Sequence, residues 1–260
     1  MGTVPISQGK GDSPHFKDHF SGHAASYAAY RPGYPRELFR FLADCCDERR
    51  QAWDCATGNG QTAVQLAHYF DRVVATDASA AQVAAASAHP KVRYGVATAE
   101  RSGLDGRSID LITVAQALHW FDLDRFFAEA RRVLVPGGVL AAWSYGLCRV
   151  EPEVDALVLE LYRDLDPYWP PERRIVDEGY RGIELPMPPI PSPGFDMSLC
   201  WSAEAMLGYL RTWSASQRCL RDRGADPVAA IADRLRGAWG GGERAVRWPL
   251  AIKLGRNPAV

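Results

Sequence analysis

The sequence contains no Cys-x-x-Cys pair and no run of eighteen apolar residues, although it has six cysteines. The missing apolar run excludes a helix that crosses a membrane, so we expect no membrane partner. The first fifteen residues also lack an apolar centre, and we expect no signal peptide there. Without a secretory segment, the cysteines are expected to be reduced thiols in a cytoplasmic protein.

The sequence also has almost no net charge: the formal value for its 260 residues is −1 at pH 7. A near-neutral chain is a poor partner for a polyanion, so we expect no nucleic acid among its ligands. The mild basic excess near the C-terminus is better explained as a solvated helix surface. A chain of this length can bury a large core and suits one α/β domain with an elaborated cap.

A glycine-rich stretch at residues 54–62 organises the chain. A short apolar segment precedes it and a helical pattern follows, which predicts a strand, a glycine turn and a helix. Gly58 and Gly60 allow a ligand to lie directly against the backbone, and the helix amides after Gly60 suit a carboxylate or a phosphate. The next apolar strand ends at Asp77, where a carboxylate suits the two hydroxyls of a ribose. Together these features predict a nucleoside-binding βαβ unit.

The glycines alone do not identify the nucleoside. Gly58, Gly60 and Ala63 satisfy the dinucleotide fingerprint. Asp54, at the tip of the first strand, would repel a pyrophosphate but favours a ligand that carries an ammonium group. On these residues the sequence resembles the class I S-adenosylmethionine-dependent methyltransferases, whose first motif is a strand, an acid and x-Gly-x-Gly-x-Gly. Ala56 stands where the first glycine is usual, which we expect to be tolerated if its φ is negative.

Two later segments carry the same resemblance. Residues 115–121 read Ala-Gln-Ala-Leu-His-Trp-Phe, similar to the fourth motif of the trans-aconitate-methyltransferase-like group within methyltransferase type 11. Residues 134–138 contain the Leu-x-Pro-Gly-Gly turn of the same family. The resemblance implies S-adenosyl-L-methionine as the cofactor. It also implies an α/β, Rossmann-like, doubly wound fold with a seven-stranded, mostly parallel sheet and helical cap insertions.

The expected organisation has three parts: a disordered tail at residues 1–14, a cofactor-binding core with an N-terminal lid at 15–145, and cap helices with the final sheet strands of the same domain at 146–260. Besides the βαβ unit, periodicity predicts helices at residues 35–46, 80–88, 123–134, 153–163, 170–180, 203–220 and 227–239. It predicts strands at residues 92–96, 109–114, 139–144 and 245–254. The cap helices are expected to lie over the C-terminal edge of the sheet.

The resemblance implies a cofactor site built from strand ends and from the N-terminal segment. Its expected members are Tyr27, Arg31, Asp54, Ala56, Thr57, Gly58, Gly60, Asp77, Ala78, Thr98, Ala99, Glu100, Gln116, Ala117 and Trp120. Arg31 suits bidentate pairing with the cofactor's carboxylate. We expect the segment that contains it to act as a lid, with Tyr30 facing the acceptor.

Methyl transfer to a small-molecule acceptor, at a carboxylate or hydroxyl oxygen, requires mainly proximity, orientation and a dry site. His119, at a strand tip, is a candidate general base, and the alternative is that it packs beside the cofactor and orients the backbone. Candidates to line the acceptor pocket are Tyr30, Trp143, Tyr209 and Trp213. The helical spacing of the last two is equally typical of a core.

Other functions remain open at this stage. His15, His19 and His23 would share one face of a helix, but Gly22 and the lack of a nearby Cys or Glu ligand favour a packing or solvent-facing role, so we expect no metal. An NAD(P)-dependent oxidoreductase would use the same glycines, yet no hydride-transfer partner is recognisable. A nucleoside-binding regulator without catalysis is the third possibility.

Overall fold

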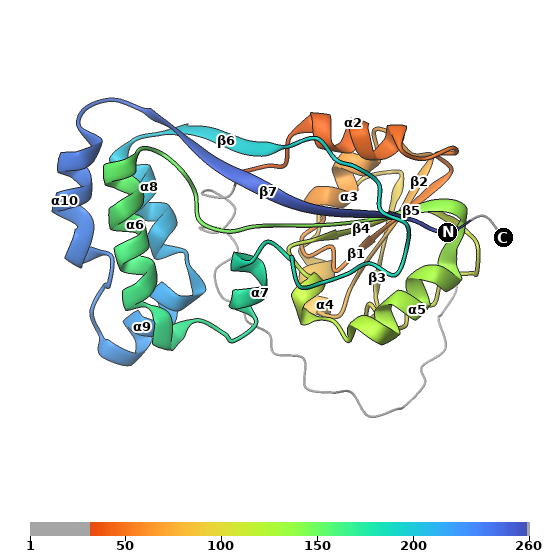
Figure 1. Ribbon diagram of the computed structural model, residues 1–260. Helices are drawn as coiled ribbons and strands as arrows, with labels where there is room; N and C mark the ends of the chain where they lie inside the picture. The colour runs from red at the N-terminus through yellow and green to blue at the C-terminus, as the bar shows by residue number, and fades with distance from the viewer. Residues whose placement is uncertain (1–31, 259–260) are drawn as a thin grey trace.

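The computed structural model describes residues 32–258. The expectations for the tail, for the lid with Tyr27, Tyr30 and Arg31, and for the three N-terminal histidines lie outside these residues. A twisted sheet with helices on both faces forms one part of the molecule, and a group of helices lies beyond one end of the sheet (Figure 1). No helix within the described residues is both long and apolar enough to cross a membrane.

The sheet has seven strands in the order β3-β2-β1-β4-β5-β7-β6. The strands are β1 Gln51–Cys55, β2 Arg72–Asp77, β3 Val92–Val96, β4 Ile109–Ala115, β5 Leu134–Tyr145, β6 Asp196–Trp201 and β7 Arg244–Arg256. Strand β7 runs antiparallel to both of its neighbours, β5 and β6, and all other strand pairs are parallel. The chain order reverses between β1 and β4, which is the switch point where open α/β sheets bind their ligands. The predicted fold class is confirmed.

The described residues form nine α-helices, some of which cover the two faces of the sheet. They are α2 Arg36–Asp44, α3 Gln61–Leu66, α4 Ala80–Ala84, α5 Leu123–Val133, α6 Pro152–Asp164, α7 Arg173–Asp177, α8 Ala203–Arg211, α9 Ser214–Arg223 and α10 Ala229–Trp239. Helices α2 and α3 pack on one face, and α5 and α7 pack on the other. Helix α5 illustrates why such a segment is helical and packs on the sheet. The Asp122 side chain caps its first turn, and the apolar residues Phe126, Ala130 and Val133 recur on the face that meets the sheet.

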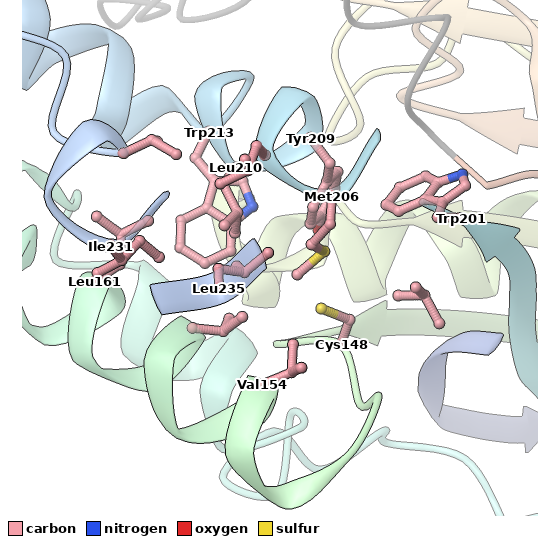
Figure 2. Packing of buried hydrophobic residues seen from close by; sticks show 14 of the residues in the cluster. Cys148, Val154, Leu161, Trp201, Met206, Tyr209, Leu210, Trp213, Ile231 and Leu235 are labelled. Atoms are coloured by element: carbon pink, nitrogen blue, oxygen red, sulfur yellow. The ribbon is translucent and has the colours of Figure 1, made fainter. Parts of the chain in front are cut away.

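The cap is the group formed by α6, α8, α9 and α10, and it lies beyond the C-terminal end of β5 (Figure 1). The inward faces of these helices share an apolar core that contains Leu161, Met206 and Leu235 (Figure 2). Tyr209 and Trp213 also belong to this core and are 3% and 5% exposed. They therefore pack within the cap, which is the core alternative that their helical spacing also allowed.

Three local predictions differ from the structure. The Pro-Gly-Gly turn lies inside β5 as a bulge, because Ile109 pairs with Leu134 while Leu111 pairs with Val139. Gly138 is required there, since a Cβ atom would lie 3.1 Å from the Ile109 carbonyl oxygen. The predicted helix at 203–220 is broken between α8 and α9, and α4 ends before residue 88. Strand β6 was not predicted, although its outward and inward side chains alternate.

Candidate functional site

The glycine loop, residues 56–60, connects β1 to α3 at the switch point of the sheet. The φ angle is 56° at Ala56 and Gly58 and 86° at Gly60. The condition of a negative φ, under which Ala56 would be tolerated without strain, is therefore not met. An L-residue with a side chain in this region costs roughly 1–2 kcal/mol, so the loop holds Ala56 in a strained conformation.

A second strained residue lies next to the loop. Gln116, which follows β4, has a φ of 56°. Because Cys55 of β1 pairs with Val114 of β4, Ala56 and Gln116 follow neighbouring parallel strands. Backbone strain of this kind persists where the surrounding structure imposes it, and it concentrates at functional sites. The two residues identify the C-terminal ends of β1 and β4 as the candidate site.

Asp54 supports the loop from beneath. Its side chain is buried and accepts hydrogen bonds from the Thr57 hydroxyl at 2.5 Å and from the Thr113 hydroxyl at 2.8 Å. Burial raises the pKa of this carboxyl to about 7, although both hydrogen bonds act in the opposite direction. Asp54 therefore lies under the loop as a carboxyl group that is partly protonated near neutral pH.

A cofactor with a net positive charge will favour the ionised form of Asp54. We expect cofactor affinity to rise about tenfold between pH 6 and pH 8, because the carboxyl with a pKa of about 7 must lose its proton when the cation binds. Titration calorimetry in two buffers of different ionisation enthalpy would measure both the affinity and the released proton. The Asp54→Asn variant should bind with no such dependence, and a wild-type affinity that is flat over this range would contradict the linkage.

Asp77, at the end of β2, ties the glycine loop to the sheet. Its Oδ2 atom accepts from the Gly58 amide at 2.8 Å, and its Oδ1 atom accepts from the Ser79 amide at 2.9 Å. A carboxylate offers about four lone-pair sites, so two remain for the hydroxyls of a ribose. The register partner of Asp77 is Val96 of β3, which is 59% exposed. An acceptor for a ribose thus lies beside an open apolar surface that an adenine ring can cover.

The other predicted cofactor residues follow the same strand ends. Ala78 and Thr98 are exposed, whereas Ala99 and Ala117 are buried. The other three predicted residues, Glu100, Gln116 and Trp120, have hydrogen-bond partners or an exposure that the sequence did not indicate. The Glu100 carboxylate accepts from the Asp122 amide at 3.1 Å, the Gln116 side-chain amide donates to the Tyr145 carbonyl at 2.9 Å, and Trp120 is 37% exposed.

Trp143 does not belong to the site, and its assignment to the acceptor pocket is wrong. It lies in the middle of the sheet with no exposed surface. The rings of Tyr34 and Phe39 pack edge-on against it at centroid distances of 5.4 Å and 6.4 Å. Strand β5 is buried on both faces, so an aromatic residue on it fills the core wherever it points.

His119 lies in the short turn after β4, beside the ring of Trp120. Its Nδ1 atom is 3.0 Å from the Tyr180 hydroxyl. Burial, followed by the positive charge of Arg173, lowers the pKa of His119 to about 4, so the imidazole is neutral at pH 7. Sequence reasoning missed Tyr180, which follows α7 and adopts a φ of 59°. Only the Gly-Tyr pair at 179–180 hinted at a sharp turn there.

Arg173, on α7, holds a fixed position near His119. It pairs with the Asp177 carboxylate at 3.0 Å and lies 5.1 Å from the centroid of the Trp169 ring. No group of three His, Cys, Asp or Glu side chains that could hold a metal occurs among residues 32–258. Two surface hollows, of about 540 and 450 Å³, are lined by residues of the second half of the chain and lie apart from the glycine loop.

Comparison with known proteins places this geometry in context. A family model described as a methyltransferase domain matches residues 53–142, from β1 to β5. A Dictyostelium discoideum protein named as a methyltransferase is 35% identical over 225 residues, which cover 85% of this chain and 86% of the relative. The solved structure of a type II methyltransferase from Anaeromyxobacter dehalogenans is 49% identical with a TM-score of 0.84, covering 89% of this chain and 100% of the other. The Bacillus subtilis YcgJ protein, 18% identical with a TM-score of 0.51 over 86% of this chain and 99% of its own, shares the fold.

Proposed function

This chain belongs to the class I S-adenosylmethionine-dependent methyltransferases, and we propose that it methylates a small molecule at an oxygen atom of a carboxylate or hydroxyl group. S-adenosylmethionine is its cofactor. Family membership argues against the NAD(P)-dependent oxidoreductase that the glycines alone left open. A regulator without catalysis is separated from an enzyme by the transfer assay below.

The residues present fit the cofactor, and in this proposal each part of it has a defined place. The glycine loop would hold the methionine part, Asp77 the ribose hydroxyls and the surface at Val96 the adenine. When bound, the cofactor supplies a methyl group that its sulfonium has already activated. The chain's own contribution is to orient the acceptor and to exclude water.

One observation supports an oxygen acceptor above all: the positive charge of Arg173 acts on the neutral imidazole of His119, at the end of β4. Arg173 lowers the pKa of His119 although Asp177 pairs with it, so its field reaches the imidazole. A positive field attracts an anionic acceptor and disfavours a protonated amine. A carboxylate is already a nucleophile, so this site needs no strong base.

The proposal is tested with methyl-labelled S-adenosylmethionine and a panel of carboxylic acids, phenols, alcohols and amines of matched size. We expect label on carboxylic acids or phenols. Mild alkali then distinguishes the products, because a methyl ester releases labelled methanol and a methyl ether retains its label. Transfer only to amines, or only to oligonucleotides or proteins, would contradict the proposal, and binding without any transfer would favour the regulator.

We further propose a cytoplasmic location and no nucleic-acid partner. The formal net charge of −1 and the six unpaired cysteines, five of which are at least partly buried, support this combination. Three basic side chains of the cap are paired with acids, since Arg211 pairs with Asp226, Arg234 with Glu160 and Arg236 with Glu204. Such paired charges offer little to a polyanion.

The lid at residues 15–34, with Tyr27 and Arg31 on the cofactor and Tyr30 toward the acceptor, remains a proposal. Its support is the place where the described chain begins. The Tyr34 ring packs 5.4 Å from Trp143 and 6.5 Å from Tyr145, at the C-terminal end of β5. Tyr34 therefore lies at the edge of the sheet where the cofactor would lie.

We expect S-adenosylmethionine to slow hydrogen exchange in residues 15–34, because docking of the lid would remove their amides from water. Mass spectrometry of exchanged peptides, with and without the cofactor, measures this directly. Peptides from α10, in the cap, provide an internal control that should not change. Equal protection of residues 15–34 in both states would contradict the lid.

A further inference from the structure

Tyr180 and His119 form a buried pair that the methyl-transfer proposal does not explain. Tyr180 has no exposed surface and packs among the apolar residues between the sheet and α7. Its hydroxyl oxygen lies 3.0 Å from Nδ1 of His119, 61 positions earlier in the chain. We propose that Tyr180 donates its hydroxyl proton to Nδ1 and so holds His119 as the Nε2–H tautomer, a hydrogen-bond donor to the methyl acceptor and not a general base.

The direction of this hydrogen bond follows from the burial of the phenol. A buried hydroxyl must place its proton on an acceptor, because leaving it unpaired costs about 1–3 kcal/mol. Among the residues that the structure describes, His119 Nδ1 is the partner of the Tyr180 hydroxyl at normal distance and angle. If Nδ1 carried the proton and donated it to the phenol oxygen, the phenol proton would have no such acceptor.

The surroundings of the phenol oxygen support the same direction. Burial raises the pKa of Tyr180, while hydrogen bonding from the backbones of Leu118 and His119 and from the Ser144 side chain lowers it. These three contacts fall outside normal hydrogen-bond distance and angle, and the Ser144 hydroxyl has no partner, so the His119 ring nitrogen is the hydrogen-bond partner of the phenol among residues 32–258. The phenol proton is left to point toward Nδ1.

The other ring nitrogen is without a partner in the described part of the chain and is not fully enclosed. Nε2 of His119 has no hydrogen-bond partner among residues 32–258, and it is not one of the unpartnered polar atoms that those residues fully enclose. Because the imidazole is neutral at pH 7 and Nδ1 is occupied by Tyr180, Nε2 carries the single ring proton. Tyr180 acts here as a positioning residue, since it reaches the acceptor only through His119.

This arrangement deepens the proposed function and rests on it for the identity of the acceptor. A carboxylate oxygen forms its bond to the methyl carbon while the carbon–sulfur bond breaks and its electron pair moves to sulfur, so an anion and a sulfonium yield a neutral ester and a thioether. No proton leaves the carboxylate, and an Nε2–H donor can orient it. An alcohol must lose a proton, which this tautomer cannot accept. The geometry therefore selects carboxylates over alcohols.

The tautomer is tested without any acceptor, on full-length protein labelled with 15N at histidine. Long-range proton–nitrogen spectra at pH 7 should show His119 as the Nε2–H tautomer, and the His119→Gln variant identifies its signals. In Tyr180→Phe the signals should shift to the average of the two tautomers. Tyr209→Phe is the matched control, because it removes another buried hydroxyl, 3.1 Å from Trp248 Nε1, and should leave His119 unchanged.

A wild-type protein with the Nδ1–H tautomer, or a Tyr180→Phe variant with the wild-type tautomer, would overturn the proposal. Neither result depends on methyl transfer, so both are distinct from a failure of the proposed function. A kinetic test follows once an acceptor is known. With saturating cofactor, His119→Ala should lower kcat/KM for a carboxylate about 10-fold to 150-fold, the loss of one hydrogen bond to a charged group. His119→Gln, which retains an N–H donor, should recover most of it, and equal losses in both variants would contradict a donor role.

Discussion

Replacing Gly60 with valine is expected to destabilise the folded protein by about 2–5 kcal/mol and to lower cofactor affinity at least a hundredfold. The backbone contributes first, because a φ of 86° strains any side chain by roughly 1–2 kcal/mol. Packing contributes the rest, at about 1–3 kcal/mol for an overfilled site. A Cβ atom at Gly60 would lie 2.2 Å from the Tyr94 hydroxyl oxygen and 2.9 Å from its ring.

The physical reason for this effect differs from the sequence-based expectation. The sequence indicates only that Gly60 lets a ligand lie against the backbone, but a side chain at this position would point into Tyr94. Tyr94 donates to the Ser87 carbonyl at 2.8 Å, and the Ser87 amide donates to the Asn59 carbonyl at 3.1 Å. The clash therefore disturbs the segment that holds the glycine loop from outside.

Chemical denaturation and calorimetry with the demethylated cofactor measure the two effects separately. Gly182→Val is the matched control, because nothing lies within 4 Å of its Cβ position and its φ is not left-handed. The double variant Gly60→Ala with Tyr94→Ala removes the clash but keeps the strained φ, so it should regain only part of the stability. If Gly60→Val binds the cofactor with wild-type affinity, the loop is not the cofactor cradle.

Removal of the Asp77 carboxylate should weaken cofactor binding by about 1.5–3 kcal/mol, the usual loss for hydrogen bonds to a charged group. That range corresponds to roughly 10-fold to 150-fold in the dissociation constant. Asp77→Ala deletes the predicted ribose acceptor, and it also leaves the Gly58 and Ser79 amides without their partner. The same substitution therefore removes a hydrogen-bond acceptor from the glycine loop and from the ribose.

Asp71→Ala is the matched control for this variant. Asp71 lies just before β2 and is exposed, so its removal alters the net charge equally and leaves the loop intact. Isothermal titration with S-adenosylmethionine and with its demethylated product gives the affinities. Wild-type affinity in Asp77→Ala would refute the assignment of Asp77 to the ribose.

The features that the sequence predicted well are encoded by neighbours in the chain. Gly58 and Gly60 lie within one turn, and Asp77 ends an apolar run, so local pattern was enough to place the nucleoside unit at a strand edge. The strand, loop and helix there appear as expected. The conformation of Ala56 was not predictable in the same way, because the hydrogen bonds around the loop impose its positive φ against its own preference.

The features that were missed depend on contacts between distant residues. Tyr180 reaches His119 across 61 positions, and nothing in the intervening sequence indicates that α7 returns to the end of β4. The burial of Trp143 and Tyr209 was equally difficult to predict from the sequence. An aromatic residue near the predicted acceptor pocket can point into the protein core or into the pocket. Only the packing of β5 and of the cap helices determines which of the two orientations it adopts.

The separate apolar core of the cap has an evolutionary consequence. The methyltransferase family model ends at residue 142, before the cap begins, and the cap helices pack mainly on one another and on the β6–β7 ribbon (Figure 1). Substitutions that reshape the cap therefore leave the glycine loop and Asp77 untouched. A lineage can therefore repack the core of the cap while it inherits the cofactor-binding half unchanged.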